Sequence, residues 1–370
     1  MFRNVCALWL VFVLILPGAV HAQDKPQVVA SFSILADVVR QVTGDEADVS
    51  SLLPVDSDPH SYDPSPQDII ALAEADIIFL NGALFEEGLL ESIENAGENM
   101  NLVEVSQCVE ILAVGGDHDE ENDEHVEVDE HVEDTATPVG AQCASHHTEV
   151  ESIMGEHEHH AGAEVLGRLY ELECGDEDHA DDDHEDEAEH EHEAGSCDPH
   201  VWTTVENVML WTLYIRDTFS DFDPDHATIY AENANAYLAE LGELQEYIEG
   251  AVATIPEENR VLLTNHETLG YFAAAYGFEI IGTVLQGGGT ANEPGAAEIR
   301  DLIDTIREHH APAIFAENTV NPDLAEQIAA ETGASMPVLY SDSLSDGDPA
   351  GTYIDYMRVN VETIVQALQG

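Results

Sequence analysis

Two stretches of the chain alternate short apolar segments with segments in which apolar residues recur at helical spacing. In residues 27–112 the apolar segments predict strands at 28–32, 49–53, 76–80 and 101–105. In residues 257–370 they predict strands at 261–264, 280–284, 313–316 and 338–340. Because helical patterns separate these strands, we expect βαβ units with parallel sheets, and therefore an α/β protein with two lobes.

A long uninterrupted helical pattern lies between the two stretches. Asp223-Pro224 is a helix-start signal, and Pro256 marks the end of the pattern. A helix of about 30 residues is about 45 Å long, which is enough to pass from one lobe to the other. We therefore predict an N-terminal lobe at 27–222, a linking helix at 223–256 and a C-terminal lobe at 257–370.

Residues 113–196, inserted into the first lobe, have a different composition. They contain 30 Asp and Glu residues and 12 His residues, and Arg168 is their only Lys or Arg. Such a segment buries too little apolar surface to fold, so we predict a largely disordered acidic, His-rich loop with local structure within 153–172. Its histidines suit a low-affinity metal collector, and a solvating spacer is the alternative.

The net charge of the whole chain narrows the choice of partners. It is -68, from 9 Lys and Arg against 77 Asp and Glu. Nucleic-acid binding is excluded because phosphate contacts need clustered Lys and Arg. Cations are the natural partners of such a surface, although most of these carboxylates are expected to serve solubility or a salty habitat.

The first 22 residues are typical of a signal peptide. Arg3 precedes an apolar run at 7–16, and Val20-His21-Ala22 forms a small-residue cleavage site before Gln23. The run is too short to span a bilayer. No Cys follows it closely, so we expect a protein without a lipid anchor, secreted into the periplasm or the medium.

Four cysteines remain after the signal peptide, and an even number outside the cytoplasm indicates two disulfides. They allow three pairings. Our hypothesis is that Cys108–Cys197 closes the base of the acidic loop and that Cys143–Cys174 lies within the loop.

Isolated histidines and one aspartate fall just beyond predicted strands. His60 follows the strand at 49–53, His266 the strand at 261–264, and Asp342 the strand at 338–340, while His200 precedes a helix. Ligands of open α/β sheets bind beyond the carboxyl ends of strands. Three imidazoles and one carboxylate form a complete four-coordinate shell that suits Zn²⁺.

The motifs around these four residues resemble those of the metal-specific solute-binding proteins of ABC importers, most closely the zinc-uptake, ZnuA-like branch. The resemblance covers about 27–112 and 197–370. It rests on the following segments, which occur in the family's order: Asp58-Pro59-His60-Ser61-Tyr62-Asp63-Pro64-Ser65-Pro66, Asp198-Pro199-His200-Val201-Trp202, His266-Glu267-Thr268-Leu269-Gly270-Tyr271-Phe272, Ala291-Asn292-Glu293-Pro294, Ile314-Phe315-Ala316-Glu317 and Asp342-Ser343-Leu344-Ser345. The chain departs from the family in its long, Cys-containing loop, and no Cys follows Cys197 to form the second-lobe disulfide of some members.

The resemblance implies a C-clamp of two lobes, a rigid linking helix and a metal ion buried between the lobes. It also implies a monomeric receptor that delivers zinc to the permease of an ABC importer. Manganese-type members carry an acidic residue where this chain has His266, so the resemblance favours zinc. We expect the neighbouring Glu267 to be solvated.

Four protein ligands leave no open coordination position for water, so we predict capture of a metal ion and no enzymatic activity. Two alternatives of the receptor function remain open. One is a manganese or iron receptor of the same fold, and the other is a metal-binding surface adhesin. A metallohydrolase is disfavoured by the closed shell.

Overall fold

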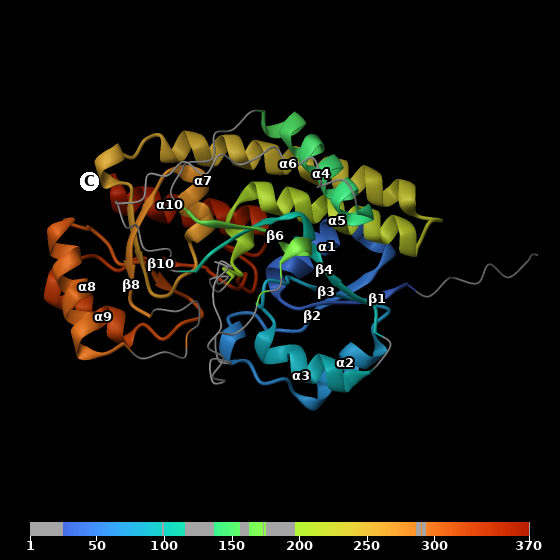
Figure 1. The fold of residues 1–370 in the computed structure, drawn as a ribbon, viewed down its shortest axis with the longest axis horizontal. Helices are drawn as coiled ribbons and strands as arrows, with labels where there is room; N and C mark the ends of the chain where they lie inside the picture. The colour runs from blue at the N-terminus through green and yellow to red at the C-terminus, as the bar shows by residue number, and fades with distance from the viewer. Residues whose placement is uncertain are drawn as a thin grey trace, which may run out of the picture.

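The computed structural model describes residues 25–97, 100–114, 137–155, 163–172, 174, 197–285, 290 and 294–369. Within these residues, two α/β lobes lie at opposite ends of the molecule, and one long helix runs along both (Figure 1). The predicted fold class, two lobes with parallel sheets and a linking helix, is therefore confirmed.

The N-terminal lobe contains a four-stranded parallel sheet in the order β2-β1-β3-β4. Its strands are β1 (Gln27–Ala30), β2 (Asp48–Ser51), β3 (Ile77–Leu80) and β4 (Leu102–Glu104). The helices between them are α1 (Ser33–Thr43), α2 (Pro66–Glu74) and α3 (Glu87–Ala96). All four residues of β3 are buried, as its continuous apolar sequence predicts for a strand covered on both faces.

The C-terminal lobe has two pairs of parallel strands, β7 (Val261–Thr264) with β8 (Glu279–Thr283) and β9 (Ala316–Glu317) with β10 (Val338–Leu339). A parallel bridge between Thr264 and Phe315 joins the pairs, so the strands lie in the order β8-β7-β9-β10. The helices of this lobe are α7 (Gly270–Tyr276), α8 (Ala296–Glu308), α9 (Asp323–Thr332) and α10 (Tyr353–Leu368).

The linking helix is α6 (Ala227–Val252), which follows α5 (Val205–Phe222). It starts after the predicted residue 223 because the Asp223 side chain accepts hydrogen bonds from His226 Nδ1 and Tyr230 OH, and this forms a turn before the helix. On its buried face, α6 contacts α1 and α5 of the first lobe and α10 of the second. One continuous helix therefore packs on both lobes.

Part of the acidic insertion is folded, and the folded part extends beyond the local structure that we expected within 153–172. Helix α4 (Pro138–Met154) packs on α5, and β6 (Val165–Arg168) pairs antiparallel with β5 (Glu110–Leu112). The helix begins with the Thr137 side chain accepting from the Gly140 amide. Strand β6 confirms the local structure expected within 153–172. The predicted disorder at 115–136, 156–162 and 175–196 lies outside the described residues.

The disulfides join Cys108 to Cys143 and Cys174 to Cys197, so the predicted pairing is wrong. The physical reason is that α4 folds back onto the lobe beside the turn that holds Cys108, while the bridge between Ala113 and Cys197 brings the end of the insertion back to its start. Each disulfide therefore closes a local segment. Among the described residues, no helix has the length and apolar character needed to cross a membrane.

Candidate metal centre

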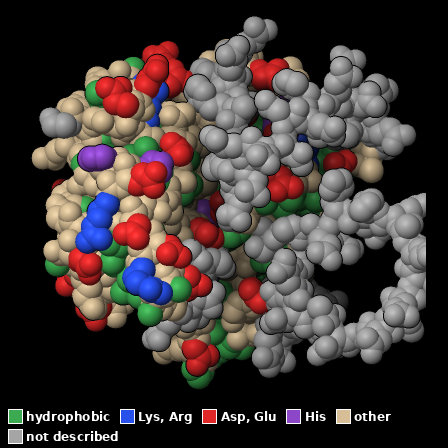
Figure 2. Space-filling view, turned by 60° about the vertical axis from the view of Figure 1, so that its left-hand side comes forward, with side chains coloured by type: hydrophobic (Ala, Val, Ile, Leu, Met, Phe, Trp, Pro, Cys, Tyr) green, Lys and Arg blue, Asp and Glu red, His purple; other side chains and the backbone are tan. Residues whose placement is uncertain are grey.

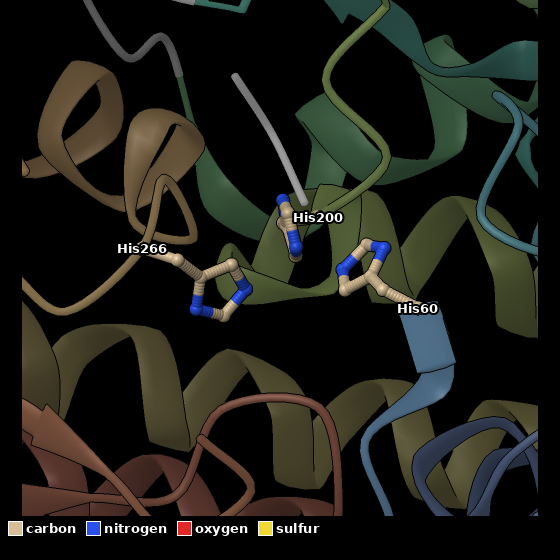
Figure 3. A group of neighbouring side chains, drawn as sticks. All are labelled: His60, His200 and His266. Carbon is tan, nitrogen blue, oxygen red and sulfur yellow. The ribbon is translucent and has the colours of Figure 1, made fainter. Parts of the chain in front are cut away.

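Three histidines from separate segments meet between the lobes. Figure 3 shows the rings of His60, His200 and His266 facing one another. Their ring centres are 5.7 Å apart for His60 and His200, 5.7 Å for His60 and His266, and 5.2 Å for His200 and His266. The structure thus brings together three residues that are far apart in the sequence.

Asp342 completes this group as the sequence analysis expected. It is buried, and its Oδ1 lies 3.8 Å from His200 Nε2 while its Oδ2 lies 3.7 Å from His266 Nε2. Thr319 Oγ1 donates a hydrogen bond of 3.3 Å to Oδ2, whereas Oδ1 has no hydrogen-bond partner. All four predicted site residues therefore lie in one cluster.

The sequence Asp-Pro-His occurs twice, and the two copies place their histidines in the same way. Asp58 Oδ1 accepts from the His60 amide at 2.9 Å, and Asp198 Oδ1 accepts from the His200 amide at 2.9 Å. In both copies the short Asp side chain caps a tight turn, which fixes the backbone of the histidine two residues later. Asp58 also accepts a hydrogen bond of 2.6 Å from Thr290 of the other lobe.

Carboxylates hold two of the three imidazoles from behind. Asp198 Oδ1 lies 2.8 Å from His200 Nδ1, and Glu317 Oε2 lies 2.6 Å from His266 Nδ1. Glu317 also accepts from the His266 amide at 2.9 Å. A carboxylate at Nδ1 fixes the ring orientation and favours an Nε2 lone pair, which is the arrangement found behind metal-bound histidines.

The sequence analysis missed these two supporting roles, although a signal for each existed. Asp198 stands two residues before His200, in the same position that Asp58 has before His60. Glu317 ends β9, and the carboxyl ends of parallel strands share one edge of a sheet, so it falls beside the residue that follows β7. Glu267, which we expected to be solvated, is half-buried.

Each of the four clustered residues presents a buried polar atom toward the cluster that has no hydrogen-bond partner. These atoms are the Nε2 atoms of His60, His200 and His266 and Oδ1 of Asp342. His266 Nδ1 and Glu317 Oε2 also lack a hydrogen bond of good geometry, although they are 2.6 Å apart. A buried polar atom without a partner costs about 1–3 kcal/mol. The three histidines offer ring nitrogens within 4.8 Å of one another, so they could hold a metal ion, with Asp342 Oδ1 as a further candidate ligand.

The electrostatics of the cluster favour neutral rings at some positions and charge at others. Burial and the other two imidazoles lower the pKa of His60 to about 2. Burial opposes a charge on His266, but the carboxylates of Glu317 and Asp342 outweigh it and raise the pKa of His266 to about 9. Burial also raises the pKa of Asp342, against the influence of His266 and His200.

A comparison with protein-family models matches residues 28–137 and 139–367 to the zinc-uptake complex component A, periplasmic (ZnuA). The chain belongs to this family. The ZnuA family comprises substrate-binding receptors of metal ABC transporters and not enzymes, so the coarse function of the chain follows from its membership.

Curated relatives are similar to the chain along most of its length, and a solved structure has a similar fold. The manganese-binding lipoprotein MntA of Halalkalibacterium halodurans is 30% identical over 92% of this chain and 88% of its own length. The manganese ABC transporter substrate-binding lipoprotein PsaA of Streptococcus pneumoniae is 23% identical over 93% and 90%. The periplasmic zinc-binding protein TroA of Treponema pallidum has a TM-score of 0.65 at 23% identity, covering 93% of this chain and 99% of TroA.

Proposed function

We propose that this chain is an extracytoplasmic receptor that binds one Zn²⁺ between its lobes and delivers it to the permease of an ABC importer. His60, His200, His266 and Asp342 are the ligands in this proposal, and Asp198 and Glu317 hold two of the imidazoles. The observation that carries it is that the Nε2 atoms of the three histidines and Oδ1 of Asp342 are buried and have no hydrogen-bond partner.

The donor set favours zinc over manganese. Zinc bonds of about 2.0–2.2 Å place neighbouring ligand atoms of a tetrahedral site about 3.4 Å apart. The proposed ligand oxygen, Oδ1 of Asp342, lies 3.8 Å from His200 Nε2, which exceeds this spacing by a few tenths of an ångström. The 3.7 Å contact with His266 Nε2 is made by the other oxygen, Oδ2. Three neutral imidazoles and one carboxylate suit zinc, whereas Mn²⁺ prefers more oxygen ligands.

A manganese receptor of the same fold is the second candidate. The names of the relatives MntA and PsaA favour it, because both are described by manganese. Competition titrations with the two metals separate the candidates. A preference for Mn²⁺ over Zn²⁺ at the tight site would contradict zinc as the cargo.

The ligand assignment is tested by metal analysis and titration calorimetry on protein purified without chelator. We expect one tightly bound zinc in the unmodified chain and none in His200→Ala. The exposed His309 provides a matched control, because His309→Ala removes an imidazole from the surface of the C-terminal lobe. Tight zinc retained by His200→Ala would refute the ligand set.

The acidic surface is consistent with a cation receptor outside the cytoplasm. Figure 2 shows Asp and Glu side chains spread over one face, with few Lys and Arg among them. The relatives MntA and PsaA are named lipoproteins, whereas our proposal is a chain cleaved before Gln23. Mass spectrometry of the mature N-terminus decides between an unmodified Gln23 and a lipid-bearing residue.

A further inference from the structure

A second cluster of metal-binding residue types lies in the first lobe, apart from the centre between the lobes. His146 of α4 is 1% exposed, and its ring lies between the Cys108–Cys143 disulfide and Asp217 of α5. His146 Nδ1 is 3.8 Å from Cys108 Sγ, and Nε2 is 2.8 Å from Asp217 Oδ2. Both cysteines are fully buried. The proposed zinc receptor function uses none of these groups.

The hydrogen bonds of the cluster fix which nitrogen of His146 carries the proton. Burial acts to raise the pKa of Asp217, but hydrogen bonds from His146 and Arg216 outweigh it and lower the pKa to about 2, so the carboxylate is ionised. An ionised carboxylate only accepts, so Nε2 donates to it. In the neutral ring, Nδ1 then presents a lone pair to Cys108 Sγ. A disulfide sulfur has no proton to donate, so this buried lone pair faces a group that cannot satisfy it.

The distance between the histidine nitrogen and one of the two sulfurs matches the spacing of neighbouring ligands in a metal site. Zn–S bonds of about 2.3 Å and Zn–N bonds of about 2.0–2.1 Å place sulfur and nitrogen about 3.6 Å apart in a tetrahedral site. The distance from His146 Nδ1 to Cys108 Sγ is 3.8 Å. Cys143 and His146 are three residues apart on α4 and so lie on the same face of the helix.

The carboxylate behind the ring completes the resemblance to a metal site. Metal-bound histidines usually donate their second ring N–H to a carboxylate, and Asp217 accepts in this way from His146. Arg216 Nε donates to Asp217 Oδ1 at 2.8 Å and holds the carboxylate in place.

We propose that reduction of the Cys108–Cys143 disulfide converts this cluster into a second metal site. In it, both thiolates and His146 Nδ1 bind a thiophilic divalent cation such as Zn²⁺. A dithiol supplies two electrons and two protons, becomes a disulfide itself and leaves two thiols. The cation then displaces both thiol protons into solvent, and water occupies the fourth position. Helix α4 stays cross-linked to the lobe in both states, by sulfur when oxidised and by the metal when reduced.

Cobalt tests the site, because Co²⁺ bound to thiolate gives a near-ultraviolet charge-transfer band that nitrogen and oxygen ligands do not give. In the full chain with Cys6→Ser, Cys174→Ser and Cys197→Ser, the remaining cysteines are Cys108 and Cys143, so any thiolate ligand must come from them. We expect no band before reduction by a phosphine and a band equivalent to one Co²⁺ per chain after the phosphine has been removed. No band after reduction would overturn the proposal.

Variants of the histidine separate a three-ligand site from binding by thiolates alone. In the same background, we expect His146→Gln to weaken cobalt binding at least tenfold, whereas the exposed control His309→Gln leaves the band unchanged. An equal band and affinity in His146→Gln would overturn the assignment of His146. His60→Ala is expected to keep the band, so failure of the centre between the lobes is distinguishable from failure of this site.

Reduction alone can loosen the packing of α4 on the lobe. A thermal melt tests whether cobalt restores this packing. If the reduced background loses its cooperative near-ultraviolet circular dichroism transition, cobalt should restore the transition when His146 is present and not in His146→Gln. Equal restoration in both proteins, or in neither, contradicts the proposal.

Discussion

Neutralising the carboxylate behind His266 tests how the proposed metal centre works. Glu317→Gln keeps the size of the side chain. It also keeps an oxygen that can accept from the His266 amide, as Glu317 Oε1 does at 2.9 Å in the unmodified chain. It removes the negative charge that lies 2.6 Å from His266 Nδ1. The amide group of Gln can also donate to Nδ1, which would place the proton on Nε2, where the proposed metal bond forms.

The magnitude follows from the role of this contact. Loss of a carboxylate behind a metal-bound histidine weakens metal binding by about 10- to 100-fold. At about 1.4 kcal/mol per tenfold change, this is about 1.4–2.8 kcal/mol of binding free energy. The proton balance should change as well. In the metal-free protein the pKa of His266 is raised to about 9, so at pH 7 zinc must displace one proton from this ring.

The sign of the pH dependence follows from this displacement. Between about pH 7 and the raised pKa of about 9, zinc affinity of the unmodified chain should rise with pH by about tenfold per unit, because one proton is released. Without the Glu317 charge the pKa of His266 falls, so Glu317→Gln should release less than one proton and show a shallower slope.

Titration calorimetry in two buffers of different ionisation enthalpy measures both the affinity and the protons released. Glu326→Gln on the exposed side of α9 is the matched control and should change neither. Unchanged affinity together with unchanged proton release in Glu317→Gln would refute the reasoning. A loss of affinity with unchanged proton release would indicate a purely structural role.

Three further predictions concern selectivity, the insertion and release. His266→Glu adds a second carboxylate, so the ratio of Mn²⁺ to Zn²⁺ affinity should rise in competition titrations, and an unchanged ratio would contradict the donor-set argument. Deletion of 117–135 and 177–195, which leaves α4 and both disulfides in place, should keep one tight zinc and remove weak sites in calorimetry, whereas loss of the tight site would contradict a collector role. Thr290→Val removes the hydrogen bond to Asp58, which contributes about 1 kcal/mol to the closed state. Zinc should therefore dissociate several-fold faster into a chelator, and an unchanged rate would show that this contact does not hold the site closed.

The sequence was sufficient for the elements whose local pattern and burial agree. Strand β7 has the bounds that its apolar residues predict, 261–264. The four clustered residues could also be predicted from the sequence. Three of them follow parallel strands, and the carboxyl ends of parallel strands meet at one edge of a sheet.

Helix α4 could not be predicted because its stability depends on contacts with distant residues. Two of its four buried residues are Gly140 and His146, so the sequence shows no clear apolar face. The helix is held by the disulfide to Cys108, the His146–Asp217 contact and an ion pair of 3.0 Å between Arg216 and Glu149. None of these leaves a local pattern. Helix α4 places Cys143 beside Cys108, so a sequence analysis that missed the helix also predicted the wrong disulfide pairing.

The ways in which the three imidazoles are held indicate where the proposed metal centre opens. His200 and His266 are fully buried and have carboxylates at Nδ1, whereas the hydrogen bond that positions His60 acts on its backbone amide. His60 is also the one member of the four that is not fully buried. Since α6 packs on both lobes, a wide separation of the lobes would disrupt buried contacts along the whole helix. A shift of the short His60 turn breaks far fewer contacts, and it exposes a metal still held by two imidazoles and Asp342. We therefore infer that release from the proposed centre requires a local movement of one ligand.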